Sequence, residues 1–202
     1  MEEAIAFIDD GFLAKLSRYF GNGKYLKFDK IKFVEILSKR ENLICKHLFY
    51  YTAPPFQSPN PSNEENKRRE QYDKFIKNLL KSEKVTLREG RCQRLKIDGK
   101  FIYKQKAVDS LLIMDMSFLP FKYQEIKNII LIASDSDFVP VIKNLKDAGI
   151  NVILATYFEK KRHAKFSTTN ELIESAGKCV ELSREDFDNA VIEKEEKNDK
   201  DK

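Results

Sequence analysis

Short apolar runs alternate along the chain with amphipathic segments of helical period, and this alternation most constrains the fold. The apolar runs have the length of strands and lie at residues 4–9, 43–51, 129–133, 151–155 and 178–182. The segments between them predict helices near residues 12–20, 29–40, 62–81, 108–118, 138–148 and 169–176. Strands that alternate with helices form a mainly parallel sheet covered on both faces. The sequence therefore predicts a doubly wound α/β fold.

Local signals refine this pattern at three places. Ser62 and Glu65 have the spacing of a capping box, which predicts the start of a helix. Residues 85–104 are rich in Arg and Lys and predict strands around Asp98-Gly99, a dipeptide that favours a type I′ hairpin turn. Pro120 is expected to stop the preceding helix near Phe118.

Length and tail composition predict one domain followed by a tail. A chain of 202 residues with 42% hydrophobic residues can bury one sizeable core. We expect that core within residues 1–183. Residues 184–202 form a charged C-terminal tail whose last ten residues are almost wholly charged, and we expect disorder at its end.

Cysteine use and charge narrow the compartment and the class of partner. Three cysteines far apart in the chain give little support to a disulfide framework or a zinc site. No apolar run reaches membrane-spanning length, so we expect a cytoplasmic protein with no membrane partner. Residues 1–183 hold 32 basic and 24 acidic residues, which fits a polyanion such as nucleic acid. An ordinary lysine-rich surface explains that excess equally well.

Aspartates stand where the strands of such a sheet should end. Asp9 closes the first apolar run, and Asp135 and Asp137 follow the run at 129–133. Asp109 lies just ahead of a short apolar helix. Carboxylates gathered at the carboxyl edge of the sheet repel one another, so protons or cations must relieve the repulsion. A hard cation such as Mg²⁺ or Mn²⁺, which takes oxygen ligands, is the simpler answer.

Each aspartate taken alone has an ordinary structural explanation. Asp135 and Asp137 immediately precede a helix, where short polar side chains commonly cap the backbone. Asp109 near a helix start complements the helix dipole. Asp9 is harder to explain in this way, because a carboxylate that ends a hydrophobic first strand is frequently functional. Only the joint pattern favours a metal site.

That joint pattern resembles a known family. The chain carries four blocks in order, which are Phe7-Ile8-Asp9-Asp10-Gly11, Tyr50-Tyr51-Thr52-Ala53-Pro54-Pro55, Gln105-Lys106-Ala107-Val108-Asp109 with Asp115, and Ser134-Asp135-Ser136-Asp137-Phe138-Val139-Pro140. Over residues 4–182 they resemble the NYN domain, and more narrowly the bacterial LabA-like group of the PIN-like nucleases. The resemblance implies a Rossmann-like PIN fold and divalent-metal-dependent cleavage of RNA.

The resemblance also implies roles for individual residues. The acids that match the family's metal site are Asp9, Asp109, Asp135 and Asp137. We expect Asp9 and Asp135 to be direct ligands of Mg²⁺ or Mn²⁺, and the other two to be further ligands or to hold water. Two further residues are expected to support the ligands without touching the metal. Ser134 is expected to orient a carboxylate. Asp115 is the other, although a structural partner for its carboxylate is the favoured reading.

The chain departs from the family pattern at four positions. The family often has Gly where Asp10, Ala107 and Ser136 stand, and often Asp where Thr52 stands. For Asp10, exposure to solvent is the favoured reading over an added ligand. The four acids themselves are retained, which argues against an inactive site.

Basic residues near the acidic edge are candidates for contacts with nucleic-acid phosphates. These candidates are Lys104, Lys106, Lys160, Lys161, Arg162 and Lys165. Three aromatic residues near the last four, Tyr157, Phe158 and Phe166, could stack on unpaired bases. Packing in the protein interior is the favoured reading for these aromatics.

Three functions remain open at this stage. The leading hypothesis is a metal-dependent ribonuclease, with an endonuclease favoured, that acts on single-stranded or structured RNA. DNA also stays open as a substrate. A non-catalytic RNA-binding or regulatory module with the same fold is the second. A phosphatase of the haloacid-dehalogenase type is the third, but Gly11 stands where its second acid belongs. Oligomeric state is left open, homo-oligomers included.

Overall fold

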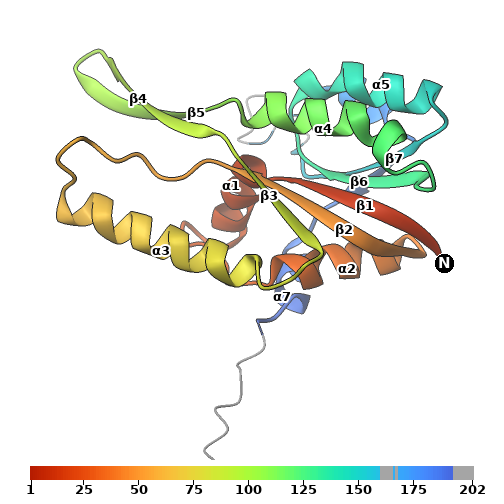
Figure 1. Cartoon of the computed structure of the whole chain (residues 1–202), viewed down its shortest axis with the longest axis horizontal. Helices are drawn as coiled ribbons and strands as arrows, with labels where there is room; N and C mark the ends of the chain where they lie inside the picture. Colours follow the sequence, from red (N-terminus) through yellow and green to blue (C-terminus); the bar gives the residue numbers. More distant parts are fainter. Residues whose placement is uncertain (160–165, 167, 193–202) are drawn as a thin grey trace, which may run out of the picture.

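The computed structural model describes residues 1–159, 166 and 168–192. The first half of the chain, drawn from red to yellow-green in Figure 1, contains β1 (Glu2–Asp9), α1 (Asp10–Phe20), α2 (Lys30–Arg40), β2 (Leu43–Thr52), α3 (Asn63–Leu79), β3 (Val85–Glu89), β4 (Arg91–Ile97) and β5 (Lys100–Lys106). The second half contains α4 (Val108–Lys122), β6 (Asn128–Ile132), the 3-10 helix η1 (Ser136–Phe138), α5 (Val139–Asp147), β7 (Asn151–Thr156), α6 (Asn170–Ser175), β8 (Lys178–Glu181) and α7 (Arg184–Asn189).

Six parallel strands form the central sheet in the order β3-β2-β1-β6-β7-β8. From β1 the successive strands β2 and β3 are added on one side, and from β6 the strands β7 and β8 are added on the other. The order of connection therefore switches between β1 and β6, and a doubly wound sheet has its binding crevice at such a switch point. Asp9 ends β1, and the segment after β6 carries Asp135. Asp9 and Asp135 therefore lie at the same edge of the sheet. The predicted α/β fold class is confirmed.

Helices cover both faces of this sheet, and a hydrophobic core lies on each face. Successive side chains of β1 point alternately into these two cores. Ala4, Ala6 and Ile8 pack with apolar residues of α1, α2 and α7. Ile5 and Phe7 pack with apolar residues of α4, α5 and α6. With both faces covered, β1 is buried from Ala4 to Ile8 and β6 over its whole length, so polar side chains gather at the edge, at Asp9 and in the turn that follows β6.

Strands β4 and β5 form a separate antiparallel hairpin, which we call the arm. Its turn has positive φ at both central residues, Asp98 at 49° and Gly99 at 76°, as the dipeptide predicts. In Figure 1 the arm projects from the body on the same side as α3. Arg94 on its inner face packs against the Phe56 ring, with 4.6 Å from the guanidinium carbon to the ring centroid. The arm therefore closes over the proline-rich loop that precedes α3.

The capping box at Ser62 and Glu65 is confirmed, but the predicted stop before Pro120 is wrong. Helix α4 includes Pro120 and continues to Lys122. A proline this near the end of a helix removes only one hydrogen bond. Burial of Leu119 and the hydrogen bond from Tyr123 N to Leu119 O (2.9 Å) retain the last turn.

Residues 184–189, placed by the sequence in the charged tail, form the helix α7. Its Phe187 is buried and packs against Phe28 and Phe33, with centroid distances of 4.8 and 5.0 Å. Arg40 on α2 donates to Asp186 at 2.9 Å. The body therefore extends to at least Ala190, which is also buried. Residues 193–202, where disorder is expected, lie outside the described residues.

The cysteines carry free thiols, as expected for a chain without a disulfide framework. Burial raises the pKa of Cys45 to about 11, and it also raises the pKa of Cys179. Both thiols are therefore protonated and unreactive at neutral pH.

Over the described part of the chain, no helix combines the length and apolar character needed to span a bilayer.

Ala107, just ahead of α4, lies in the left-handed region with φ 69° and ψ 0°. This conformation costs an L-residue about 1–2 kcal/mol and glycine almost nothing. We expect Ala107→Gly to raise the free energy of unfolding by up to about 1 kcal/mol, because the greater freedom of glycine in the unfolded chain offsets part of the gain. Urea unfolding measures the change.

Ala148 provides a matched control for this substitution. It is also exposed, but its φ is −79°, so it has no left-handed strain for glycine to relieve. Ala148→Gly should therefore lower the free energy of unfolding by about 0.5–1 kcal/mol. Equal effects of the two glycines would contradict the strain at Ala107.

Candidate metal centre and nucleic-acid groove

Asp9 joins β1 to α1 and caps the helix. Its side chain accepts a hydrogen bond from Gly11 N at 2.9 Å. Burial, and next the negative charge of Asp109, raise the pKa of Asp9 from 3.8 to about 7, against the opposing effect of the backbone hydrogen bonds. A carboxylate whose ionisation is opposed in this way gains free energy when a cation approaches.

Asp135 and Asp137 lie in the turn between β6 and α5. The Asp135 side chain caps η1 by accepting a hydrogen bond from Asp137 N at 3.0 Å. Both carboxylates are exposed, whereas the neighbouring Phe138 is fully buried and anchors the turn. Asp135 is therefore a helix cap, as one explanation of its position predicted. The cap uses Oδ1, and Oδ2 of the same carboxylate can contact solvent or a ligand.

Asp109 lies in the first turn of α4 and interacts electrostatically both with Asp9 after β1 and with the aspartates after β6. Desolvation, and next the charges of Asp135 and Asp137, raise its pKa, and Asp109 in turn raises the pKa of Asp9. Asp109 therefore lies within electrostatic reach of the other three predicted acids. Among the described residues, no three His, Cys, Asp or Glu side chains converge tightly enough to hold an ion unaided.

Asp10 does more than face solvent, so the favoured reading of this departure is incomplete. It is half-buried, and its carboxylate accepts hydrogen bonds from the hydroxyls of Tyr50 and Thr52, the latter at 3.0 Å. The pairing of Ile8 with Tyr50 in the sheet brings the end of β2 beside the start of α1. Each oxygen of Asp10 thus accepts a hydrogen bond from a side-chain hydroxyl, whereas the Asp9 carboxylate accepts from the backbone of α1.

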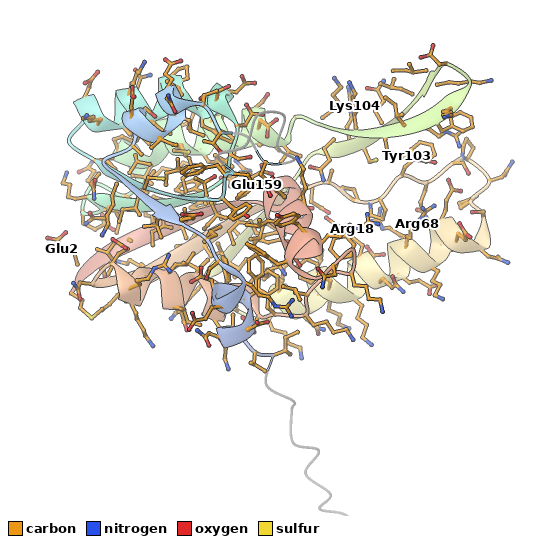
Figure 2. All side chains as sticks on the ribbon, turned by 180° about the vertical axis from the view of Figure 1, so that it is seen from behind. Glu2, Arg18, Arg68, Tyr103, Lys104 and Glu159 are labelled. Atoms are coloured by element: carbon orange, nitrogen blue, oxygen red, sulfur yellow. The ribbon has the colours of Figure 1, made fainter. Side chains whose placement is uncertain are left out.

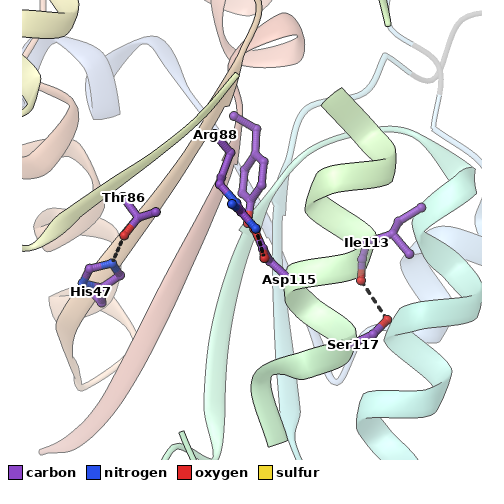
Figure 3. Close-up of polar contacts among 7 residues, drawn as sticks. His47, Thr86, Arg88, Ile113, Asp115 and Ser117 are labelled. Atoms are coloured by element: carbon purple, nitrogen blue, oxygen red, sulfur yellow. Dashed lines mark hydrogen bonds and ion pairs between the residues drawn. The ribbon is translucent and has the colours of Figure 1, made fainter. Parts of the chain in front are cut away.

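Asp115 has the structural partner favoured from its sequence position. Figure 3 shows Arg88 of β3 reaching across to Asp115 of α4, and both distances of this bidentate pair are 2.6 Å. Tyr51 also donates to Asp115, at 2.9 Å. Burial alone would raise the pKa of Asp115, but these two partners outweigh it and lower the pKa. The carboxylate thus joins the sheet edge to α4.

The predicted basic residues divide into two groups. Lys104 and Lys106 are exposed on β5, and strand alternation places them on the face of the arm opposite to Tyr103 and Gln105 (Figure 2). The second group, Lys160, Lys161, Arg162 and Lys165, lies outside the described residues. Of the nearby aromatics, Phe166 is buried against Tyr19, with centroids 5.1 Å apart, which supports the packing reading.

A groove of about 1020 Å³ begins beside the acidic edge and contains basic residues that the sequence reading missed. Asp10 and Gly11 line its end, and Lys15 and Arg18 of α1 and Arg68 of α3 line its length. Figure 2 shows Arg18 and Arg68 in the space between α3 and the arm. The one available signal was the spacing of Lys15 and Arg18, which puts both on one face of a helix.

A model of the NYN domain family matches residues 15–183 of the chain. The match includes Asp109, Asp135 and Asp137 and begins after Asp9. The fold is similar to the crystal structure of a protein of unknown function from Vibrio parahaemolyticus RIMD 2210633, with a TM-score of 0.56 and 15% identity over 92% of this chain and 95% of that chain. At this identity the likeness concerns the fold alone. No curated protein matches the chain.

Proposed function

We propose that this chain, which belongs to the NYN domain family, is a divalent-metal-dependent ribonuclease that hydrolyses RNA phosphodiester bonds. The family is one of PIN-like nucleases that act on nucleic acid. The observation that carries the proposal is the repulsion between Asp109 and each of Asp9, Asp135 and Asp137 at the switch point of the sheet. Repulsion between neighbouring carboxylates lowers the stability of the fold unless a cation binds them, and groups perturbed in this way are often part of a functional site.

The chemistry of the donors fits Mg²⁺ or Mn²⁺. Carboxylate oxygens are hard ligands, and Mg²⁺ in proteins usually binds one or two of them and keeps several waters. A site of this kind does not need three side chains in a closed cage, so the spread of the four acids is compatible with it. When bound, the ion neutralises phosphate charge and lowers the pKa of a water.

The chain's own residues would position the ion and the substrate. We assign Asp9 and Asp135 as direct ligands, and Asp109 and Asp137 as further ligands or holders of water. Ser134, half-buried at the end of β6, would orient a neighbouring carboxylate. The hydrogen bond from Gly11 N holds one oxygen of Asp9 in place. We also propose that the protein belongs to the LabA-like group and is located in the cytoplasm.

A mixed pool of single-stranded and structured RNA tests the proposal. Wild-type protein should cut the RNA with Mg²⁺ or Mn²⁺, lose the activity in excess EDTA and regain it when the metal is restored. Asp135→Asn should keep its fold by circular dichroism and lose cleavage. Asp147→Asn, at the end of α5 and also exposed, is the matched control and should cut normally.

Three outcomes would reject the proposal. Cleavage that persists unchanged in EDTA would exclude the metal. Binding of RNA without any cleavage under either metal would favour the non-catalytic module. Rapid hydrolysis of a small phosphomonoester with no action on RNA would instead favour the phosphatase.

A further inference from the structure

The groove beside the acidic edge is positively charged along its length. Lys15, Arg18 and Arg68 line it, and Asp10 is the one acid among its lining residues. The Asp10 carboxylate is already occupied by the hydroxyls of Tyr50 and Thr52. Within the described part of the chain, neither Arg18 nor Arg68 forms an ion pair with a carboxylate. Arg18 donates one hydrogen bond to Gly23 O at 3.0 Å and lies over the Tyr25 ring, with 5.8 Å from the guanidinium carbon to the centroid. These neutral partners leave the positive charge for an anionic ligand.

The groove ends beside Asp9, which is not itself one of its lining residues. A Cβ built on Gly11 would lie 3.1 Å from Asp9 Oδ1 and 3.2 Å from Gln105 Oε1. Gly11 and Gln105 both line the groove, so its end touches the carboxylate assigned to the metal. A chain of phosphates lying on the basic residues would thus pass the acidic edge.

A side pocket of about 410 Å³ opens from the groove. The two share five lining residues, which are Asp10, Ala14, Tyr25, Gln71 and Tyr72. Deeper in the pocket, Phe28 and Phe75 add aromatic surface, and Lys30 Nζ lies 3.4 Å from the Phe28 centroid. Flat aromatic walls with a few polar groups fit a nucleobase, which stacks on its faces and bonds along its edge.

We propose that the groove binds a single strand of RNA, with phosphates on Lys15, Arg18 and Arg68 and one unpaired base in the side pocket between Tyr25 and Tyr72. The choice of RNA rests on the proposed nuclease function. A base in a duplex is paired and stacked, so it cannot enter the pocket without being flipped out. The arrangement therefore selects single-stranded over double-stranded RNA.

Binding measured in EDTA tests this inference with cleavage switched off. The probe is a fluorescein-labelled RNA strand of about 12 nucleotides, compared by anisotropy with the same strand annealed to its complement. The single strand should bind at least about 10-fold more tightly. Tyr25→Ala should weaken single-strand binding about 10-fold with no change in the salt dependence. Tyr25 is 64% exposed, so the variant should fold normally.

Arg68→Ala should act differently from Tyr25→Ala. It should weaken binding about 3–10-fold and lower the slope of log K against log salt by about 0.7, the value for one phosphate contact on a single strand. Lys77→Ala is the matched control, because Lys77 is an exposed basic residue of α3 outside the groove. Its affinity should stay within about twofold of the wild type.

The results separate this inference from the proposed function. Equal affinity for single and double strands, or wild-type binding by both Tyr25→Ala and Arg68→Ala, would overturn the inference even where metal-dependent cleavage is found. Single-strand binding with the expected variant effects, but no cleavage under Mg²⁺ or Mn²⁺, would support the groove and reject the nuclease.

Discussion

Asp9→Asn is expected to abolish metal-dependent RNA cleavage and, in the same protein, to raise the resistance to unfolding above pH 7. Loss of the carboxylate removes a charge that would hold the metal beside the reacting phosphate. We expect the cleavage rate to fall about 10³-fold or more. The measurement is the single-turnover rate on an RNA that the wild type cuts, at saturating Mg²⁺ or Mn²⁺.

The gain in stability follows from the raised pKa of Asp9. Burial and the charge of Asp109 raise it from 3.8 to about 7, so between these pH values the folded protein holds a proton that the unfolded chain has lost. The free energy of unfolding therefore falls as pH rises from about 4 to about 7. Asparagine cannot ionise, so this loss disappears, and it can still accept the hydrogen bond from Gly11 N.

We expect Asp9→Asn to be more stable than wild type by about 1–3 kcal/mol at pH 8 in EDTA, and equal to it near pH 4. Urea unfolding at the two pH values measures the difference. Added Mn²⁺ should raise the melting temperature of wild type and leave that of the variant unchanged. A variant that is less stable than wild type at pH 8, or that cuts at more than about a tenth of the wild-type rate, would contradict the assignment of Asp9.

The strands and the acidic edge could be predicted because their signals are local. An apolar run that is buried on both faces of a sheet is visible in the sequence, and so is the aspartate that follows it. The hairpin turn was also local, since Asp98 and Gly99 tolerate the positive φ that it requires. That the acids lie at the same edge of the sheet follows from the strand order, which alternation of strands and helices favours but does not determine.

What escaped prediction depends on contacts between distant segments. Helix α7 is short and highly charged, and it is held by Phe187 among aromatic residues of α2 and the preceding loop. The burial of Asp10 depends on the pairing of β1 with β2. The groove combines Arg18 from α1 with Arg68 from α3, and these residues lie 50 positions apart in the chain. No periodicity in the sequence reports such a combination.

Asp115→Ala is expected to cause the largest loss of stability. The Asp115 side chain is 6% exposed and that of Arg88 is 35% exposed, so the substitution leaves a half-buried guanidinium and a buried Tyr51 hydroxyl without their acceptor. Removing one partner of a buried pair costs about 3–5 kcal/mol, and we expect about 2–4 kcal/mol here because Arg88 can reach solvent. The melting temperature should fall by roughly 5–12 °C.

The pH dependence of this pair runs opposite to that of Asp9. The pKa of Asp115 is lowered, so its contribution is complete at neutral pH and is lost only as pH falls through that lowered pKa. Asp73→Ala, which removes an exposed pair with Arg69 on α3, is the matched control and should change stability by less than about 0.5 kcal/mol. Similar losses in the two variants would show that burial adds nothing to the Asp115 pair.

A double variant separates the orphaned charge from the lost contact. Arg88→Met combined with Asp115→Leu replaces the pair by apolar side chains of similar size, and such replacements are often neutral for stability. The double variant should recover at least half of the stability lost in Asp115→Ala, and the Tyr51 hydroxyl should account for the rest. Because Asp115 serves the packing of β3 against α4, RNA cleavage by the folded double variant should remain close to that of the wild type. A loss of cleavage comparable to that of Asp9→Asn would instead place Asp115 in the metal site.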